Sequence, residues 1–195
     1  HNDVIAVGSQ NVFFFHADAF LHPKRVKREL QEAFGPGLHL VEVASEDIPI
    51  EEAIASYLFN SQLVTLLSGE MALVVPKECK ESTRVWGYLE GLVGEDPFIR
   101  RIEVVDVRQS MENGGGPACL RLRAVLTEEE MQRVSGSVMF GDDLFQKLEA
   151  WVDKHYRDRL TEADLGDPHL LGESRKALDE LTQMLELGSL YPFQR

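Results

Sequence analysis

Residues 3–15 read DVIAVGSQNVFFF, which is an apolar run, a four-residue turn and a second apolar run. Two short apolar runs around a turn containing glycine and asparagine are typical of a β-hairpin. A helix should follow from Pro23, because apolar residues recur there at four-residue spacing, and Gly35-Pro36-Gly37 should end it. Residues 38–43 form a further apolar run. The order predicts a β-β-α-β unit whose helix has the apolar stripe Val26, Leu30 and Phe34.

The same order recurs about 60 residues later. A shift of 59 residues places Val12–Phe15 on residues 71–74, and Val4-Ile5 on Leu63-Val64. One such unit per period indicates radial or stacked repetition, in which each unit buries its faces against its neighbours. The alternative is that β-β-α-β units recur by chance in an α/β protein. We place the two units at about 3–43 and 62–107, the second with strands 63–67, 71–75 and 102–107 and helix 81–92.

The rest of the chain is predicted to be mostly helical. Residues 50–58 indicate a short helix between the units, and a loop at 109–118 leads into a strand at 120–126. Thr127 opens a capping-box pattern, and helical stripes continue to residue 189. The apolar end of the chain should pack down. No low-complexity linker separates these parts, so we predict one portion of a single α/β domain over residues 1–195.

Composition excludes several classes of protein. The 195 residues are 44% hydrophobic and 27% charged, which is typical of globular proteins. No apolar run approaches the ~18 residues that a membrane span needs. The net charge of −13 is spread along the chain without a basic stripe, so we expect neither nucleic acid nor a membrane as partner. Two cysteines cannot build a disulfide framework, which favours a reducing cytoplasm.

The first residue is His1, followed at once by a strand pattern. We therefore expect the chain to be a piece of a longer polypeptide. His1 and Asp3 should share one face of a strand start. An imidazole there can act as a general acid–base, and a carboxylate can bind a cationic ligand. The alternative is that a terminal histidine has no role.

Residues 113–119 read NGGGPAC and are the strongest chemical motif. Three successive glycines are costly in backbone entropy, so we expect them where the backbone approaches another group closely or takes a positive φ. In the predicted strand, Arg121 and Arg123 share the face of Cys119 and would favour its thiolate. The alternative is a small buried hydrophobic residue beside a flexible loop, with arginines that pair with local carboxylates.

The other candidate side chains are weaker. Cys79 has cationic neighbours and no close-approach glycines, so we interpret it as an incidental surface thiol. His16, Asp18 and His22 lack a third closely spaced partner, so no metal site is predicted.

Residues 1–8, 113–123 and 190–195 closely resemble the N-succinylarginine dihydrolases, the bacterial enzymes of the arginine succinyltransferase pathway of arginine catabolism. The resemblance runs along the whole chain, which looks like the C-terminal portion, somewhat under half, of the family's polypeptide. It implies the pentein fold, a five-bladed α/β propeller of β-β-α-β units, of which the chain would hold two blades and a helical tail.

The resemblance also implies the chemistry. Cys119 matches the family's nucleophile, His1 its catalytic histidine, Asp3 a carboxylate that holds the guanidinium, and Asn113 a substrate-binding residue. A third catalytic residue, a glutamate, and the main succinyl-binding residues would lie in the N-terminal half of the polypeptide. The small-molecule substrate would be N2-succinylarginine, and no metal or organic cofactor would be needed. We expect a cytoplasmic homodimer.

Three functions remain open on this basis. The first is hydrolysis of succinylarginine to succinylornithine, two ammonia and carbon dioxide. The second is a related pentein deiminase that stops at the ureido product, and the third is a noncatalytic binding module. Intact His1, Asp3, Asn113 and Cys119 argue against the third. Only the family match favours the first over the second.

Overall fold

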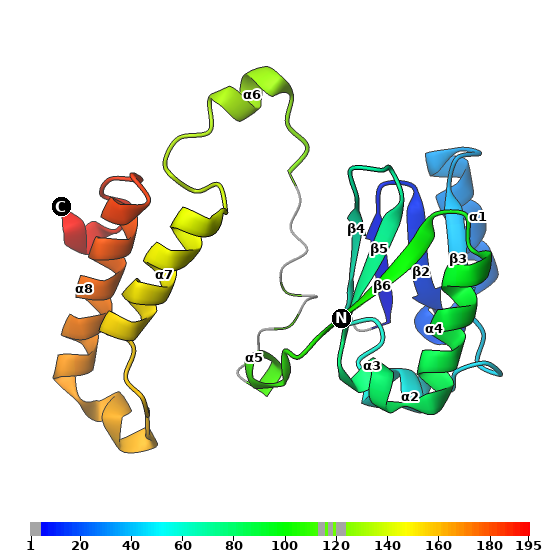
Figure 1. Cartoon of the computed structure of the whole chain (residues 1–195), viewed down its shortest axis with the longest axis horizontal. Coiled ribbons are helices and arrows are strands. Elements are labelled where there is room, and N and C mark those ends of the chain that lie inside the picture. Colours follow the sequence, from blue (N-terminus) through cyan, green and yellow to red (C-terminus); the bar gives the residue numbers. More distant parts are fainter. Residues whose placement is uncertain (1–4, 113–115, 117–118, 120–123) are drawn as a thin grey trace. The chain divides into compact units, whose positions relative to one another are not determined.

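The computed structural model describes residues 5–112, 116, 119 and 124–195. It divides into two compact units, residues 1–123 and residues 124–195 (Figure 1). The first is a mixed α/β unit and the second is helical in its described elements. No linker composition marks the division between them. That both belong to a single catalytic domain stays a prediction.

The first unit opens with the hairpin that the sequence predicts. Strands β1 (Ala6–Ser9) and β2 (Val12–His16) pair antiparallel around a two-residue turn. The short 3-10 turn η2 (Ala17–Ala19) and helix α1 (Pro23–Phe34) then carry the chain to β3 (His39–Val43). Strand β3 pairs parallel with β2, which gives the sheet order β1-β2-β3.

The second sheet repeats this topology. Strand β4 (Gln62–Thr65) pairs antiparallel with β5 (Met71–Pro76), which pairs parallel with β6 (Ile99–Val105). The crossover consists of α3 (Glu78–Glu81) and α4 (Thr83–Glu95). The order β4-β5-β6 therefore confirms a second β-β-α-β unit.

A single offset does not relate the two hairpins. Val12 pairs with Ser9 in the first, and Met71 pairs with Thr65 in the second. The second strands are thus 59 residues apart, but the first strands are offset by 56, from Ser9 to Thr65. The predicted equivalence of Val4-Ile5 with Leu63-Val64 is wrong, because the second hairpin loop is three residues longer.

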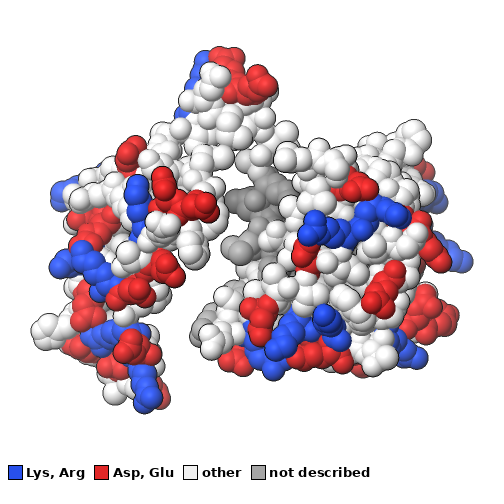
Figure 2. All heavy atoms as spheres, viewed as in Figure 1, with Lys and Arg blue, Asp and Glu red and all other residues white. Residues whose placement is uncertain are grey.

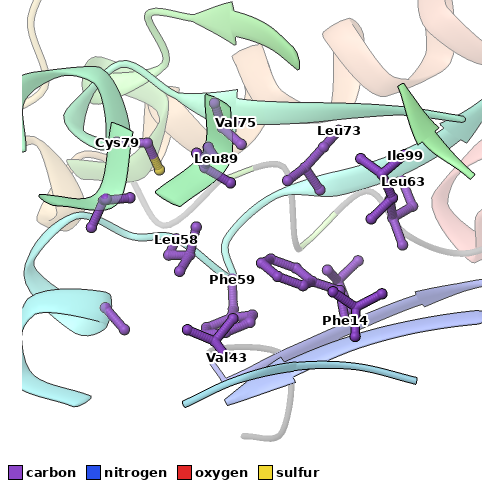
Figure 3. Close-up of a cluster of buried hydrophobic side chains, with 14 of the residues drawn as sticks. Phe14, Val43, Leu58, Phe59, Leu63, Leu73, Val75, Cys79, Leu89 and Ile99 are labelled. Carbon is purple, nitrogen blue, oxygen red and sulfur yellow. The ribbon is translucent and has the colours of Figure 1, made fainter. Parts of the chain in front are cut away.

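Both sheets of this unit face one hydrophobic core (Figure 3). Phe14 and Val43 project from the first sheet, and Leu63, Leu73 and Ile99 from the second. Phe59 packs its ring against Phe14 with the centroids 4.9 Å apart. It comes from the segment between helix α2 (Ile50–Ala55) and β4, so this connection is part of the core.

The two crossover helices differ in burial. Ser82 caps the start of α4 by accepting a hydrogen bond from the backbone N–H of Val85, and this helix buries Val85 and Leu89. Helix α1 buries no residue fully, and Phe34 of its predicted apolar stripe is exposed.

The segment after β6 departs from the prediction. Residues 108–112 form helix α5 (Arg108–Glu112), where a loop was expected. Residues 124–126 are exposed and belong to no strand, so the predicted strand 120–126 is wrong in its last three residues. Of these three residues only Val125 is β-branched, and neither described sheet includes them. Residues 120–123 lie outside the described residues.

The second unit begins with α6 (Glu128–Gln132), whose predicted capping box at Thr127 is confirmed. Helix α7 (Asp142–His155) packs against α8 (Pro168–Met184), and the Trp151 indole donates to the carbonyl of Ala177 at 3.0 Å. Between them lies the 3-10 turn η4 (Glu162–Gly166). The terminal turn η5 (Pro192–Gln194) packs on α8, because the Gln194 amide donates to Asp179 and Thr182.

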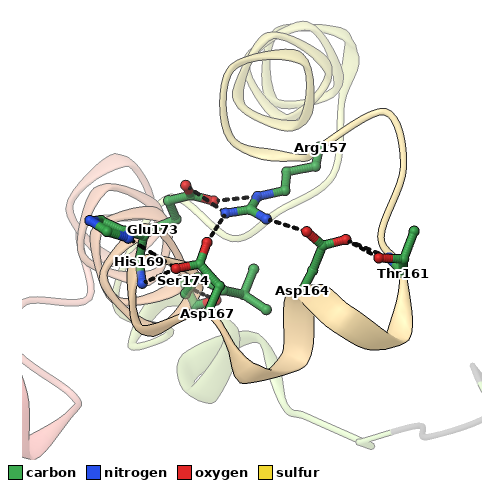
Figure 4. Close-up of polar contacts among 8 residues, drawn as sticks. Arg157, Thr161, Asp164, Asp167, His169, Glu173 and Ser174 are labelled. Carbon is green, nitrogen blue, oxygen red and sulfur yellow. Dashed lines mark hydrogen bonds and ion pairs between the residues drawn. The ribbon is translucent and has the colours of Figure 1, made fainter.

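Ion pairs hold the connection between α7 and α8. Arg157 donates to Glu173, Asp164 and Asp167 at 2.8 to 3.3 Å (Figure 4). On the face shown in Figure 2, acidic and basic side chains are interspersed over both units. In the described part of the chain, no helix is both long and apolar enough to cross a membrane.

Candidate active site

Cys119 is exposed in a turn. In sequence it comes shortly after residues 113–116, which we call the glycine-rich segment. Its backbone N–H donates to the carbonyl of Gly116, three residues earlier in the chain, at 2.9 Å. Both cysteines of the chain are described, and they form no disulfide. An exposed thiol on such a turn is accessible to a small electrophile.

Gly116 is buried against Asn60. A Cβ atom at Gly116 would lie 2.4 Å from Nδ2 of Asn60 and 2.8 Å from its Oδ1, far inside van der Waals contact. The prediction that the glycine run permits a close backbone approach is confirmed at this position. The group approached is an amide side chain of the same unit.

Asn60 has a fixed place in the unit. It follows the fully buried pair Leu58 and Phe59, and its backbone N–H donates to the carbonyl of Tyr57 at 2.9 Å. Its side-chain Nδ2 also lies 3.2 Å from the sulfur of Met111 on α5. Sequence reasoning missed Asn60. The only sign of it in the sequence is that a polar residue stands between the apolar pair Leu58-Phe59 and a predicted strand.

Helix α5, which precedes the glycine-rich segment, is held by Arg108. Its Nε donates to Glu78 at 2.8 Å, and a terminal nitrogen donates to Glu81 at 3.1 Å. The hydrogen bond and charge of Glu78 raise the pKa of Arg108. A pocket of about 320 Å³ lies beside the ion pair of Arg108 and Glu78. It is lined by Tyr57, Glu78, Arg108, Met111 and Glu112.

Cys79 is not the surface thiol that we expected. It is fully buried on α3, and its sulfur lies 3.2 Å from the carbonyl oxygen of Ser56. Burial raises its pKa to about 12, with the neighbouring charge of Glu78 adding to the effect. The prediction was wrong because α3 packs over the second sheet and buries Cys79. The charged residues next to Cys79 in sequence do not reveal this packing. A thiol with this pKa has almost no thiolate near neutral pH and is inert.

His1, Asp3 and Asn113 lie outside the described residues, as do Arg121 and Arg123. Their roles stay predictions.

His16, one of the residues considered as metal ligands, has a structural role. Nε2 of the buried His16 lies 2.8 Å from the carbonyl oxygen of Ile48, and its Nδ1 accepts from the backbone N–H of Asp18. Both ring nitrogens are thus engaged within the protein. Among the described residues, no three His, Cys, Asp or Glu side chains gather into a set that would hold a metal.

Comparison with known proteins identifies the class of protein. A family model described as succinylarginine dihydrolase matches residues 1–194. The chain therefore belongs to the succinylarginine dihydrolase family, whose members are hydrolases by name.

Individual relatives agree with the family model. The N-succinylarginine dihydrolase of Hahella chejuensis is 55% identical over 195 residues, and that of Aliivibrio salmonicida is 52% identical over the same length. The enzyme of that name from Pseudoalteromonas atlantica is 54% identical over 196 residues. Each match covers 100% of this chain and 44% of the relative. The chain thus spans somewhat under half the length of these curated relatives, and corresponds to their C-terminal portion.

Proposed function

We propose that this chain is the nucleophile-bearing part of an enzyme that hydrolyses N2-succinylarginine to N2-succinylornithine, two ammonia and carbon dioxide. The observation that carries the proposal is the family match over residues 1–194. An exposed Cys119 shortly after the glycine-rich segment supports it, because a nucleophilic thiol must be reachable by substrate.

The chemistry begins with attack of the Cys119 thiolate on the guanidinium carbon. A guanidinium is stabilised by resonance, so carboxylates must hold its nitrogens and align the carbon above the sulfur. Asp3 would supply one of these carboxylates, Asn113 would contact the substrate, and the positive charge of the substrate would favour the thiolate. The attack forms a C–S bond and a tetrahedral adduct.

His1 would then act as general acid and general base. It donates a proton as the C–N bond breaks and ammonia leaves, which gives a covalent S-alkylthiouronium. It next takes a proton from a water molecule that attacks this carbon, and the C–S bond breaks to give succinylcitrulline and the thiolate. A second cycle on the ureido carbon releases the second ammonia and carbon dioxide. In sum, succinylarginine and two water molecules give succinylornithine, two ammonia and carbon dioxide.

The rest of the polypeptide completes the site in this proposal. A glutamate and the succinyl-binding groups would come from the N-terminal half, and the whole enzyme would be a cytoplasmic homodimer that needs no cofactor. The two described β-β-α-β sheets support a pentein propeller, since each would be one of its five blades. The N-terminal half would supply the others.

The test is a Cys119→Ser substitution in the complete polypeptide. A hydroxyl has too high a pKa to replace the thiolate, so kcat/KM should fall at least ~100-fold, which corresponds to ~2.7 kcal/mol in barrier. The proposal is falsified if more activity than this remains. Cys79→Ser is the matched control. It keeps a donor for the carbonyl of Ser56 and should retain activity, although a hydroxyl in the core lowers stability.

Counting ammonia separates the dihydrolase from a deiminase. The proposed enzyme releases two ammonia for each succinylarginine consumed, whereas a deiminase releases one and accumulates the ureido product. A count of one would be consistent with the proposed cysteine chemistry but would contradict the proposed dihydrolase activity.

A further inference from the structure

We propose that Asn60 is a positioning residue for Cys119. The inference rests on the proposed function, in which Cys119 is the nucleophile. Asn60 belongs to the segment between α2 and β4, nearly 60 residues away from Cys119 in sequence. It lies against Met111, two residues before the glycine-rich segment, and against Gly116, the last of its glycines.

The first contact is on the side before the segment. Nδ2 of Asn60 donates to the sulfur of Met111 at 3.2 Å. Met111 lies on α5, which Arg108 ties to Glu78 and Glu81. Helix α5 is thus fastened to the same unit that carries Asn60.

The second contact is inside the segment. The three atoms nearest to a Cβ at Gly116 would all belong to Asn60, at 2.4, 2.8 and 3.0 Å. The Asn60 amide therefore occupies the space that a side chain at Gly116 would need. Because the carbonyl of Gly116 accepts the N–H of Cys119 at 2.9 Å, a shift at Gly116 is passed to the thiol-bearing residue.

Asn60 can act as such a support because its own backbone is immobilised. Leu58 and Phe59 beside it are fully buried, and its N–H is bonded to Tyr57. A nucleophile displaced by about 1 Å can lose about 100-fold in rate. The side chain that sets the position of Gly116 therefore sets the rate without touching the substrate.

A double-mutant cycle in the complete polypeptide tests this coupling. Gly116→Ala should lower kcat about 100-fold in the presence of Asn60, because the new Cβ clashes with its amide. Asn60→Ala should lower kcat at least about 10-fold, since the support is lost, and leave KM for succinylarginine within about 3-fold. In the Asn60→Ala background, Gly116→Ala should cost less than about 3-fold more, because the clashing atoms are gone.

Matched controls separate positioning from general damage. Gly91→Ala adds a methyl on α4 where no atom lies within 4 Å, and Asn11→Ala removes an amide that donates to the carbonyl of Gly37. Both should keep wild-type kcat. If Gly116→Ala does not fold, Asn60→Ser takes its place, because the shorter side chain should lose both contacts and lower kcat as Asn60→Ala does.

The proposal is overturned if Asn60→Ala keeps wild-type kcat, or if Gly116→Ala is equally harmful with and without Asn60. The same four proteins are also reacted with iodoacetamide, and the rate at Cys119 is measured from its peptide by mass spectrometry. The rate should show the same coupling between Asn60 and Gly116, and additive effects on it would equally reject the proposal. Because alkylation needs no turnover, this measurement decides about Asn60 even if Cys119→Ser shows that the proposed function is wrong.

Discussion

The two cysteines show how strongly the surroundings determine the chemistry of one residue type. Cys119 is exposed in a turn, whereas Cys79 is enclosed by the core between the second sheet and its crossover helices, near Val75 and Leu89 (Figure 3). Burial disfavours the charged form of Cys79 and raises its pKa to about 12. Cys79 therefore cannot serve as a nucleophile near neutral pH.

This difference predicts a simple labelling result. Iodoacetamide at pH 8 should alkylate Cys119 in the folded protein and leave Cys79 unmodified, because Cys79 is both inaccessible and protonated at that pH. In denaturant both should react. Peptide mass spectrometry reads the two sites separately. Rapid labelling of Cys79 in the folded protein would show that α3 does not cover it.

At the scale of elements, the helices α7 and α8 are held by a packed indole and by carboxylates. Glu180 on α8 accepts from Lys154 and from the buried ring of His155, both at 2.7 Å, and these contacts lower its pKa to about 2. The N–H groups of Arg157, which lies in the connection, likewise lower the pKa of Glu173 on α8 (Figure 4). The carboxylate forms therefore stabilise this helical pair.

The sign of the resulting pH dependence follows from the lowered pKa. The usual pKa of a glutamate is 4.5, so the stabilisation by Glu180 is complete above that pH and is lost as the pH falls towards about 2. Glu180→Gln should lower the melting temperature at pH 7, and this difference should shrink between pH 4.5 and 2. Thermal unfolding followed by circular dichroism measures it.

Glu149→Gln is the control for this titration. Glu149 lies exposed on α7, and the described structure records no ion pair for it. This substitution should change the melting temperature little at any pH. If the difference in melting temperature between Glu180→Gln and the wild type did not depend on pH, the charge of Glu180 would not hold the helices together.

At the scale of the whole molecule, the chain spans 44% of its relatives. The described residues hold two small sheets of three strands each. We therefore expect the remainder of the polypeptide to be needed for activity.

The 195-residue chain alone should release no ammonia from succinylarginine above a Cys119→Ala blank. The catalytic glutamate and the succinyl-binding groups would be missing, and loss of positioning alone costs orders of magnitude in rate. Activity should return on mixing with the separately produced remainder only if the two parts assemble. Turnover by the chain alone would place the whole active site within these residues.

Local patterns were enough to predict much of this protein. Alternating apolar runs and turns predicted both β-β-α-β units, and Thr127 predicted a helix start, because hairpins and caps depend on residues close together in sequence. The glycine run before Cys119 predicted a close backbone approach, although not the residue that is approached. The roles of His1, Asp3 and Asn113 stay predictions.

Other features depended on contacts between distant residues. The burial of Cys79, the longer second hairpin loop and the Asn60 amide against Gly116 appear only in the folded chain. A sequence records which side chains are available, and its periodicity indicates which face of an element is apolar. Which residue of a distant segment meets that face is decided by how whole sheets and helices pack, so only the tertiary structure determined these contacts.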